Sequence, residues 1–245
     1  MAIDTTKTVR EFVLELPSST NVFEQLGIDY CCGGQKPLAE ACAAAGKKLD
    51  NLTAALERLQ SEQQTRTAPE NNWTALPLYD LIEHIKSTHH AYVREQIPNI
   101  EALLDKVTAK HGENHPELAS VRDKFDALAD ELGSHLMKEE QILFPYIARM
   151  EESSVQHEPA PSSCFGSVEN PIRMMMAEHD NAGEALREMR RLTADYKVPE
   201  DACTSFRALY KLLQEFEADL HQHIHKENNI LFPRAMRACP GAHEE

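Results

Sequence analysis

Glycine is scarce in this chain, with 9 residues in 245, and no series of β-branched runs alternates with turn residues. Sheet proteins depend on such runs, bounded by glycine and other turn formers. Long apolar runs are missing as well, because no stretch approaches the roughly 20 apolar residues that a membrane helix needs. These absences argue against a β-protein and against a membrane-spanning one, and they leave helices as the expected structure.

Basic residues are outnumbered, with 25 Lys and Arg against 40 Asp and Glu and a net charge of -15. Such a surface repels nucleic-acid phosphates. The opening stretch "MAIDTTKTVREFVLEL" also lacks the basic and then apolar regions of a secretion signal. We therefore expect a cytoplasmic protein without a nucleic-acid or membrane partner. Its six cysteines are then expected to be thiols or ligands rather than disulfides.

The first part of the chain is predicted to form short helices. Their stretches are "TVREFVLEL", "SSTNVFEQLG" with a Ser/Thr cap, "PLAEACAAAG" and "DNLTAALERLQ". The polar stretch "QQTRTAPENN" that follows has the composition of a linker. We therefore expect a small helical domain at residues 1–65 and a second domain at residues 73–240.

Four long amphipathic segments follow, at about residues 76–110, 116–150, 171–196 and 200–238. The short connections "HGENHP" and "KVPE" predict two antiparallel hairpins. A longer connection, rich in Pro and Ser, joins the hairpins. The predicted fold is all-α, an up-down four-helix bundle preceded by the small helical domain.

One eleven-residue motif occurs twice in the bundle, as "HLMKEEQILFP" from His135 and as "HIHKENNILFP" from His223. In each copy a Glu follows the His by four residues, one turn along the same helix face. Residues 3, 7 and 10 positions before each His are apolar, which places both histidines on the buried stripe. These residues are Leu132, Leu128 and Phe125 in the first copy and Leu220, Phe216 and Leu213 in the second.

The other helix of each hairpin carries a matching histidine. Apolar residues follow His179 at the same spacings, and they also follow His90. The adjacent His89 is instead followed by Tyr92, Gln96 and Asn99. His90 is therefore predicted to point inward.

The bundle core thus gathers imidazoles and carboxylates at one level. A single buried histidine is commonly a core residue with one hydrogen bond, but two buried carboxylates require a cation. Six donors exceed the closed four-ligand shell of structural zinc, and mixed His and carboxylate ligation with open positions suits non-haem iron. We predict a di-iron centre with an oxo or hydroxo bridge. Its expected ligands are His90, His135, Glu139, His179, His223 and Glu227.

The order of His before Glu by four residues resembles hemerythrin, and with "EHDNAGE" and "DYCCGG" the motifs resemble the Repair of Iron Centers family of di-iron proteins. The resemblance covers essentially the whole chain. It implies a hemerythrin-like bundle, a ScdA-type N-terminal domain and the six ligands above. It also implies damaged or apo iron-sulfur proteins as partners, nitric oxide as a ligand, and a homodimer as one candidate assembly.

Three functions stay open at this point. The first is repair of iron-sulfur clusters damaged by nitric oxide or oxidants, through supply of iron. The second is an enzyme, a nitric oxide reductase that forms nitrous oxide. The third is a hemerythrin-like protein that binds or senses oxygen or nitric oxide.

Cys31 and Cys32 lie in a glycine-rich turn before the helix that is predicted to begin near Pro37. A helix N-terminus favours the thiolate, although the effect decays within a turn. Two small buried residues in a turn would be the structural alternative. We predict a thiol role for the pair in holding iron or passing electrons. Cys203 has no motif around it, and neither have Cys164 and Cys239.

Overall fold

The computed structural model describes residues 3–65, 73–159, 161–163 and 165–238, and within these ranges it contains helices and no strand. The all-α prediction is confirmed. The chain divides into two compact units, residues 1–76 with 224–233, and residues 77–223 with 234–245. Most of the predicted linker, together with Cys164 and Cys239, lies outside the described residues.

Four helices form the first part of the chain: α1 (Val9–Glu15), α2 (Ser19–Leu26), α3 (Leu38–Ala44) and α4 (Leu49–Thr65). Helix α1 begins with a capping box, in which the Thr8 hydroxyl accepts from the Glu11 N–H and the Glu11 carboxylate accepts from the Thr8 N–H. The predicted cap of α2 is wrong, because Ser18 is itself helical and makes no capping hydrogen bond. Gly27 ends α2 with φ 65°, a conformation that favours glycine.

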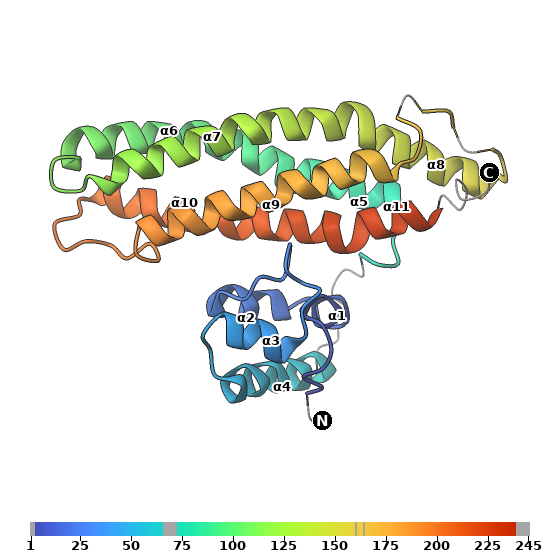
Figure 1. Cartoon of the computed structure of the whole chain (residues 1–245), viewed down its shortest axis with the longest axis horizontal. Helices are drawn as coiled ribbons and strands as arrows, with labels where there is room; N and C mark the ends of the chain where they lie inside the picture. Colours follow the sequence, from blue (N-terminus) through green and yellow to red (C-terminus); the bar gives the residue numbers. More distant parts are fainter. Residues whose placement is uncertain (1–2, 66–72, 160, 164, 239–245) are drawn as a thin grey trace. The chain divides into compact units, whose positions relative to one another are not determined.

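The four long segments of the bundle are seen in Figure 1. The first consists of α5 (Leu78–Ile85), η1 (Lys86–His90) and α6 (Ala91–His111). The second consists of α7 (Glu117–Lys138), η2 (Glu139–Leu143) and α8 (Phe144–Gln156). The third is α9 (Glu169–Leu192), and the fourth consists of α10 (Thr204–Lys226), η3 (Glu227–Leu231) and α11 (Phe232–Ala238).

Two segments end elsewhere than the sequence predicted, and the fourth begins at Thr204 rather than near 200. The second segment continues six residues past 150, to Gln156, and the Glu151 carboxylate accepts hydrogen bonds from the N–H groups of Leu78 and Tyr79 at 2.6 and 2.9 Å. Glu151 thus caps a helix that is distant in sequence, which no local pattern reveals. The third segment stops at Leu192 rather than 196, because residues 194–196 take positive φ values of 50–64°.

Three short π-helical turns, η1, η2 and η3, interrupt the long segments. A π-turn bonds each N–H to the carbonyl five residues back and therefore holds one residue more than an α-turn, which shifts the helix face that follows. Such turns are frequent at functional sites. The 3.6-residue periodicity of the sequence does not reveal them.

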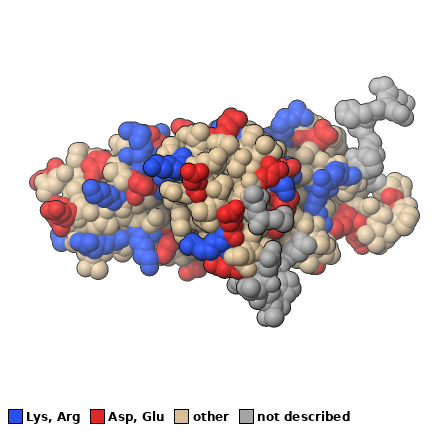
Figure 2. Space-filling view, turned by 90° about the horizontal axis from the view of Figure 1, so that it is seen from below, with Lys and Arg blue, Asp and Glu red and all other residues tan. Residues whose placement is uncertain are grey.

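The surface in Figure 2 carries acidic and basic side chains interspersed, without a continuous basic tract on the face shown. In the part of the chain that the structure describes, no helix is both long and apolar enough to cross a membrane.

A core substitution tests the packing of the bundle. Phe125 is fully buried and packs edge-on against Phe216, with ring centroids 5.6 Å apart. We expect Phe125→Ala to lower the free energy of unfolding by about 3–5 kcal/mol, because it leaves a cavity. Urea unfolding of the metal-free proteins measures this, since bound metal would add stability of its own.

The matched control is Val155→Ala, at a side chain of the same segment that is 73% exposed. It should change the free energy of unfolding by no more than about 0.5 kcal/mol. Equal losses in the two variants would contradict the packing described here.

Candidate metal centre

The structure brings all six predicted ligands together in two adjacent groups. Within each group, one ligand atom from every residue lies within 4.8 Å of the others. One group is His90, His223, Glu139 and Glu227, and the other is His135, His179, Glu139 and Glu227. Both glutamates therefore belong to both groups. The sequence left open which histidines share a metal, and the grouping pairs His90 with His223 and His135 with His179.

The π-turns carry three of the six residues. His90 is the last residue of η1, Glu139 is the first residue of η2 and Glu227 is the first residue of η3. His179 lies in the uninterrupted helix α9. Each Glu lies at the junction where an α-helix gives way to a wider turn, so the local backbone helps to aim its side chain inward.

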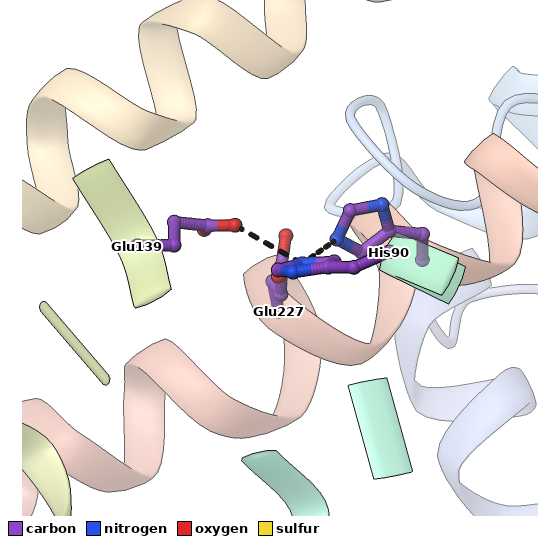
Figure 3. A group of neighbouring side chains, drawn as sticks. His90, Glu139 and Glu227 are labelled. Carbon is purple, nitrogen blue, oxygen red and sulfur yellow. Dashed lines mark hydrogen bonds and ion pairs between the residues drawn. The ribbon is translucent and has the colours of Figure 1, made fainter. Parts of the chain in front are cut away.

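Glu139 lies between the two groups. Its Oε2 atom is 3.4 Å from Nε2 of His90 and 3.4 Å from Nε2 of His135. Figure 3 shows the side chains of His90, Glu139 and Glu227 pointing toward one another. A carboxylate placed equally between two imidazoles of different groups has the position of a bridging ligand.

The paired histidines face each other through the same ring atom. Nε2 of His90 lies 3.1 Å from Nε2 of His223, and Nε2 of His135 lies 3.1 Å from Nε2 of His179. Two imidazoles that converge through Nε2 beside a shared carboxylate form a compact set of nitrogen and oxygen donors.

The donor set fits a pair of cations. Glu139 and Glu227 are both 0% exposed, and the four histidines are at most 3% exposed. Removing two carboxylates from water is costly unless positive charge compensates them. Two metal ions at the shared carboxylates would supply that charge, and imidazole nitrogens would complete their ligands.

A second layer of carboxylates holds two of the histidines. Nδ1 of His90 lies 2.7 Å from Oε1 of Glu140, and Nδ1 of His135 lies 2.8 Å from Oε2 of Glu178. When Nδ1–H donates to a carboxylate, the Nε2 lone pair of the neutral ring is free to bind a metal. Both partners are Glu residues within the quoted motifs, but the sequence alone did not assign them this role.

Basic side chains in turn keep these outer carboxylates charged. Arg94 pairs with Glu140 at 2.9 Å, and Lys138 pairs with Glu178. Partial burial raises the pKa of each carboxyl, but the hydrogen bonds from the basic side chain and from the histidine outweigh it. The pKa of each therefore lies below its usual value, and both outer carboxylates stay ionised as acceptors for Nδ1–H.

His89 is buried as well, although the sequence favoured only its neighbour His90 as the inward residue. His89 is 4% exposed, its Nδ1 lies 2.9 Å from Oδ1 of Asp219, and its ring stacks parallel to His223 at 5.6 Å. The wider turn η1 lets two successive histidines face the interior. His89 lies outside both groups of ligands.

A further group combines Cys31 and Cys32 with Asp29. The two Sγ atoms are 3.7 Å apart, and Oδ1 of Asp29 accepts the N–H groups of Cys31 and Cys32 at 3.1 and 2.9 Å. The hydrogen bond with Cys32, burial and the Asp29 charge raise the pKa of Cys31 well above its usual value. The helix N-terminus is expected to favour the thiolate, but this effect does not prevail at Cys31. Cys31 is held as a neutral thiol.

Residues 224–233 belong to the same unit as this cysteine turn. Nδ2 of Asn229 donates to the carbonyl oxygen of Tyr30 at 3.1 Å, and Nη2 of Arg10 donates to the carbonyl oxygen of Asn229 at 3.0 Å. His225 is buried beside Asn229, and burial with the nearby Lys226 charge lowers its pKa to about 3. His225 lies outside both ligand groups.

Comparison with known proteins matches two family models. Residues 80–235 match the hemerythrin HHE cation binding domain, and residues 5–60 match ScdA_N, a domain of unknown function. The chain is 38% identical over 224 residues to the iron-sulfur cluster repair protein YtfE of Yersinia pseudotuberculosis serotype IB (strain PB1/+). It is equally similar to the protein of the same name from Yersinia pestis (strain Pestoides F).

In both cases the match covers 91% of this chain and 94% of the relative. The ligand groups lie within the part of the chain that matches the hemerythrin model. The chain therefore belongs to the hemerythrin HHE family and, over nearly its whole length, to the family of YtfE iron-sulfur cluster repair proteins.

Proposed function

We propose that this protein holds two non-haem iron ions and repairs iron-sulfur clusters damaged by nitric oxide or oxidants by supplying iron. One observation carries the proposal: two histidine pairs share two fully buried glutamates. Mixed imidazole and carboxylate ligation is typical of non-haem iron. Similarity to proteins named for cluster repair supports the same function.

The residues of the site would have three different roles. Glu139 and Glu227 would bridge the two ions, and each histidine pair would complete one of them. Glu140 and Glu178 hold the proton of two imidazoles at Nδ1, which keeps Nε2 of those rings directed inward. Bound iron would supply the ion to be delivered and the redox chemistry. We include in the proposal an oxo or hydroxo bridge between the two irons.

Partners and location follow from this function. Damaged or apo iron-sulfur proteins would receive the iron, and the cytoplasm, where thiols stay reduced, is the proposed compartment. Cys31 and Cys32 would release their protons on binding iron and hold it as thiolates on the way to a thiolate-rich cluster, because sulfur is a softer ligand than imidazole or carboxylate.

A second candidate function is reduction of nitric oxide to nitrous oxide. Each ligand group offers four residues, and non-haem iron sites with mixed histidine and carboxylate ligation keep open positions, which leaves room for a small ligand. Reversible binding of oxygen or nitric oxide would use the same vacant positions.

The first prediction concerns the shared carboxylates. Glu139→Ala removes a donor from both groups, whereas His179→Ala removes a donor from one. We therefore expect loss of iron in Glu139→Ala, and in Glu227→Ala, to be at least as severe as in His179→Ala. Metal analysis of the purified proteins gives the stoichiometry, with two irons expected in the unsubstituted chain.

Glu131→Ala, an exposed change in the same helix as His135, is the matched control and should retain both irons. Full iron content in both Glu139→Ala and Glu227→Ala would show that the glutamates are neighbours of the metals and not ligands.

The second prediction separates the candidate functions. The iron-loaded protein is incubated without oxygen with an apo iron-sulfur enzyme, and in a parallel reaction with nitric oxide and a reductant. An iron donor restores the apo-enzyme and loses its own iron in proportion. Formation of nitrous oxide over many turnovers, with iron retained, would favour the reductase. Reversible ligand binding without iron transfer and without nitrous oxide would favour a sensor.

The third prediction concerns the cysteine turn. Cys31 and Cys32 belong to neither ligand group, so the double change of both to Ser should preserve iron content and the absorption spectrum. Reactivation of a nitric-oxide-damaged iron-sulfur enzyme should slow. The Cys203→Ser protein, altered in the other unit, controls for the loss of a thiol. Reactivation at the unsubstituted rate in the double variant would assign the pair a structural role.

A further inference from the structure

Cys203 directly precedes helix α10, at the end of the bundle remote from the metal ligands. It is a free, partly exposed thiol. Twenty residues separate it from His223 along the same helix, which corresponds to about 30 Å at 1.5 Å per residue. Its chemistry is therefore independent of the candidate metal centre.

Two histidines, one at the end of α6 and one in the connection that follows it, lie beside this helix start. The Phe206 ring, in the first turn of α10, packs against His111 at 5.3 Å and against His115 at 5.1 Å between centroids. His115 in turn pairs with Asp201, two residues before Cys203, and with Glu117, each at 3.0 Å. These contacts bring the end of α6 and the start of α10 together around the thiol.

His111 is the buried polar group of this cluster. It is the last residue of α6 and is 8% exposed. Its Nε2 atom is buried and makes no well-aligned hydrogen bond within the described residues. The ring nevertheless lies close enough to the Cys203 side chain to stabilise a sulfur anion. His111 is therefore the buried side chain of this cluster placed to stabilise a thiolate at Cys203.

The surroundings lower the pKa of Cys203 to about 7. The Phe206 N–H contributes most and the His111 side chain next, while burial opposes them and the Ser205 N–H and the Lys110 charge add to the lowering. At Cys42, by contrast, burial prevails and raises the pKa of the thiol. Near neutral pH, Cys203 is thus much richer in thiolate than an ordinary cysteine.

We propose that Cys203 is a modification site that forms mixed disulfides with low-molecular-weight disulfides of the glutathione type, with His111 positioned to stabilise the reacting thiolate. The Cys203 sulfur attacks one sulfur of the disulfide, the old S–S bond breaks, and the departing thiolate takes a proton from water. Cys203 is oxidised and the departing sulfur is reduced, so electrons balance. A free thiol reverses the exchange by the same route.

The local charges suit an anionic disulfide. The nearby carboxylates of Asp201 and Glu117 are both paired with His115. The side chains that favour a negative charge at the thiol are then Lys110 and His111.

The test uses the iron-loaded full chain and oxidised glutathione. Samples are reacted between pH 6 and 9.5, quenched with acid and mapped by mass spectrometry, which gives a rate for each cysteine. We expect the rate at Cys203 to rise with pH to a midpoint near 7, and iron content to stay unchanged. Cys42 of the same molecules, a buried thiol, should react much more slowly.

His111→Gln should move the midpoint of the Cys203 reaction upward, toward the value of an ordinary thiol at about 8.5. His157→Gln, at an exposed histidine, should leave it unchanged. A wild-type midpoint at or above 8.5, or a Cys203 rate no greater than that of Cys42, would overturn the proposal. The wild-type profile decides this even if His111→Gln does not fold.

Discussion

Two carboxylates without access to solvent, Glu139 and Glu227, are the constraint on which the metal-binding end of the bundle depends. A carboxylate in a helical core requires opposing charge, and four inward-facing imidazoles cannot all supply it while they serve as neutral ligands. The surrounding structure is consistent with this requirement. Outer carboxylates fix the tautomer of two rings, and Arg94 and Lys138 keep those carboxylates ionised.

The π-turns meet the geometrical side of the same constraint. A regular α-helix keeps one narrow face inward, and a shift of that face at the level of the ligands requires a locally wider turn. Widened turns at η1, η2 and η3 provide this without breaking the helices. The consequence is visible at His89 and His90, which are adjacent in sequence and both buried.

The helical class, the bundle and the inward position of the six candidate ligands could be predicted because they depend on periodicity and on a repeated motif. Three kinds of feature could not. The cap that Glu151 gives to α5 joins residues more than 70 positions apart. The π-turns change the period on which the prediction relied. The pKa of Cys203 depends on His111, which becomes its neighbour only in the folded chain. The pKa of Cys31 depends on burial and on the turn that holds the nearby Asp29 against it.

Sharing of both glutamates between the ligand groups gives the centre an internal symmetry. Exchanging the two hairpins replaces His90 by His179, His135 by His223 and Glu139 by Glu227, and it converts one group into the other. Neither hairpin alone contains a complete group. Two copies of a single hairpin related by a two-fold axis would present the same six donors. The centre therefore has the form expected of a gene duplication that joined the halves of an isologous dimer, after which the copies diverged, as Gln141 and Asn229 did at matching positions.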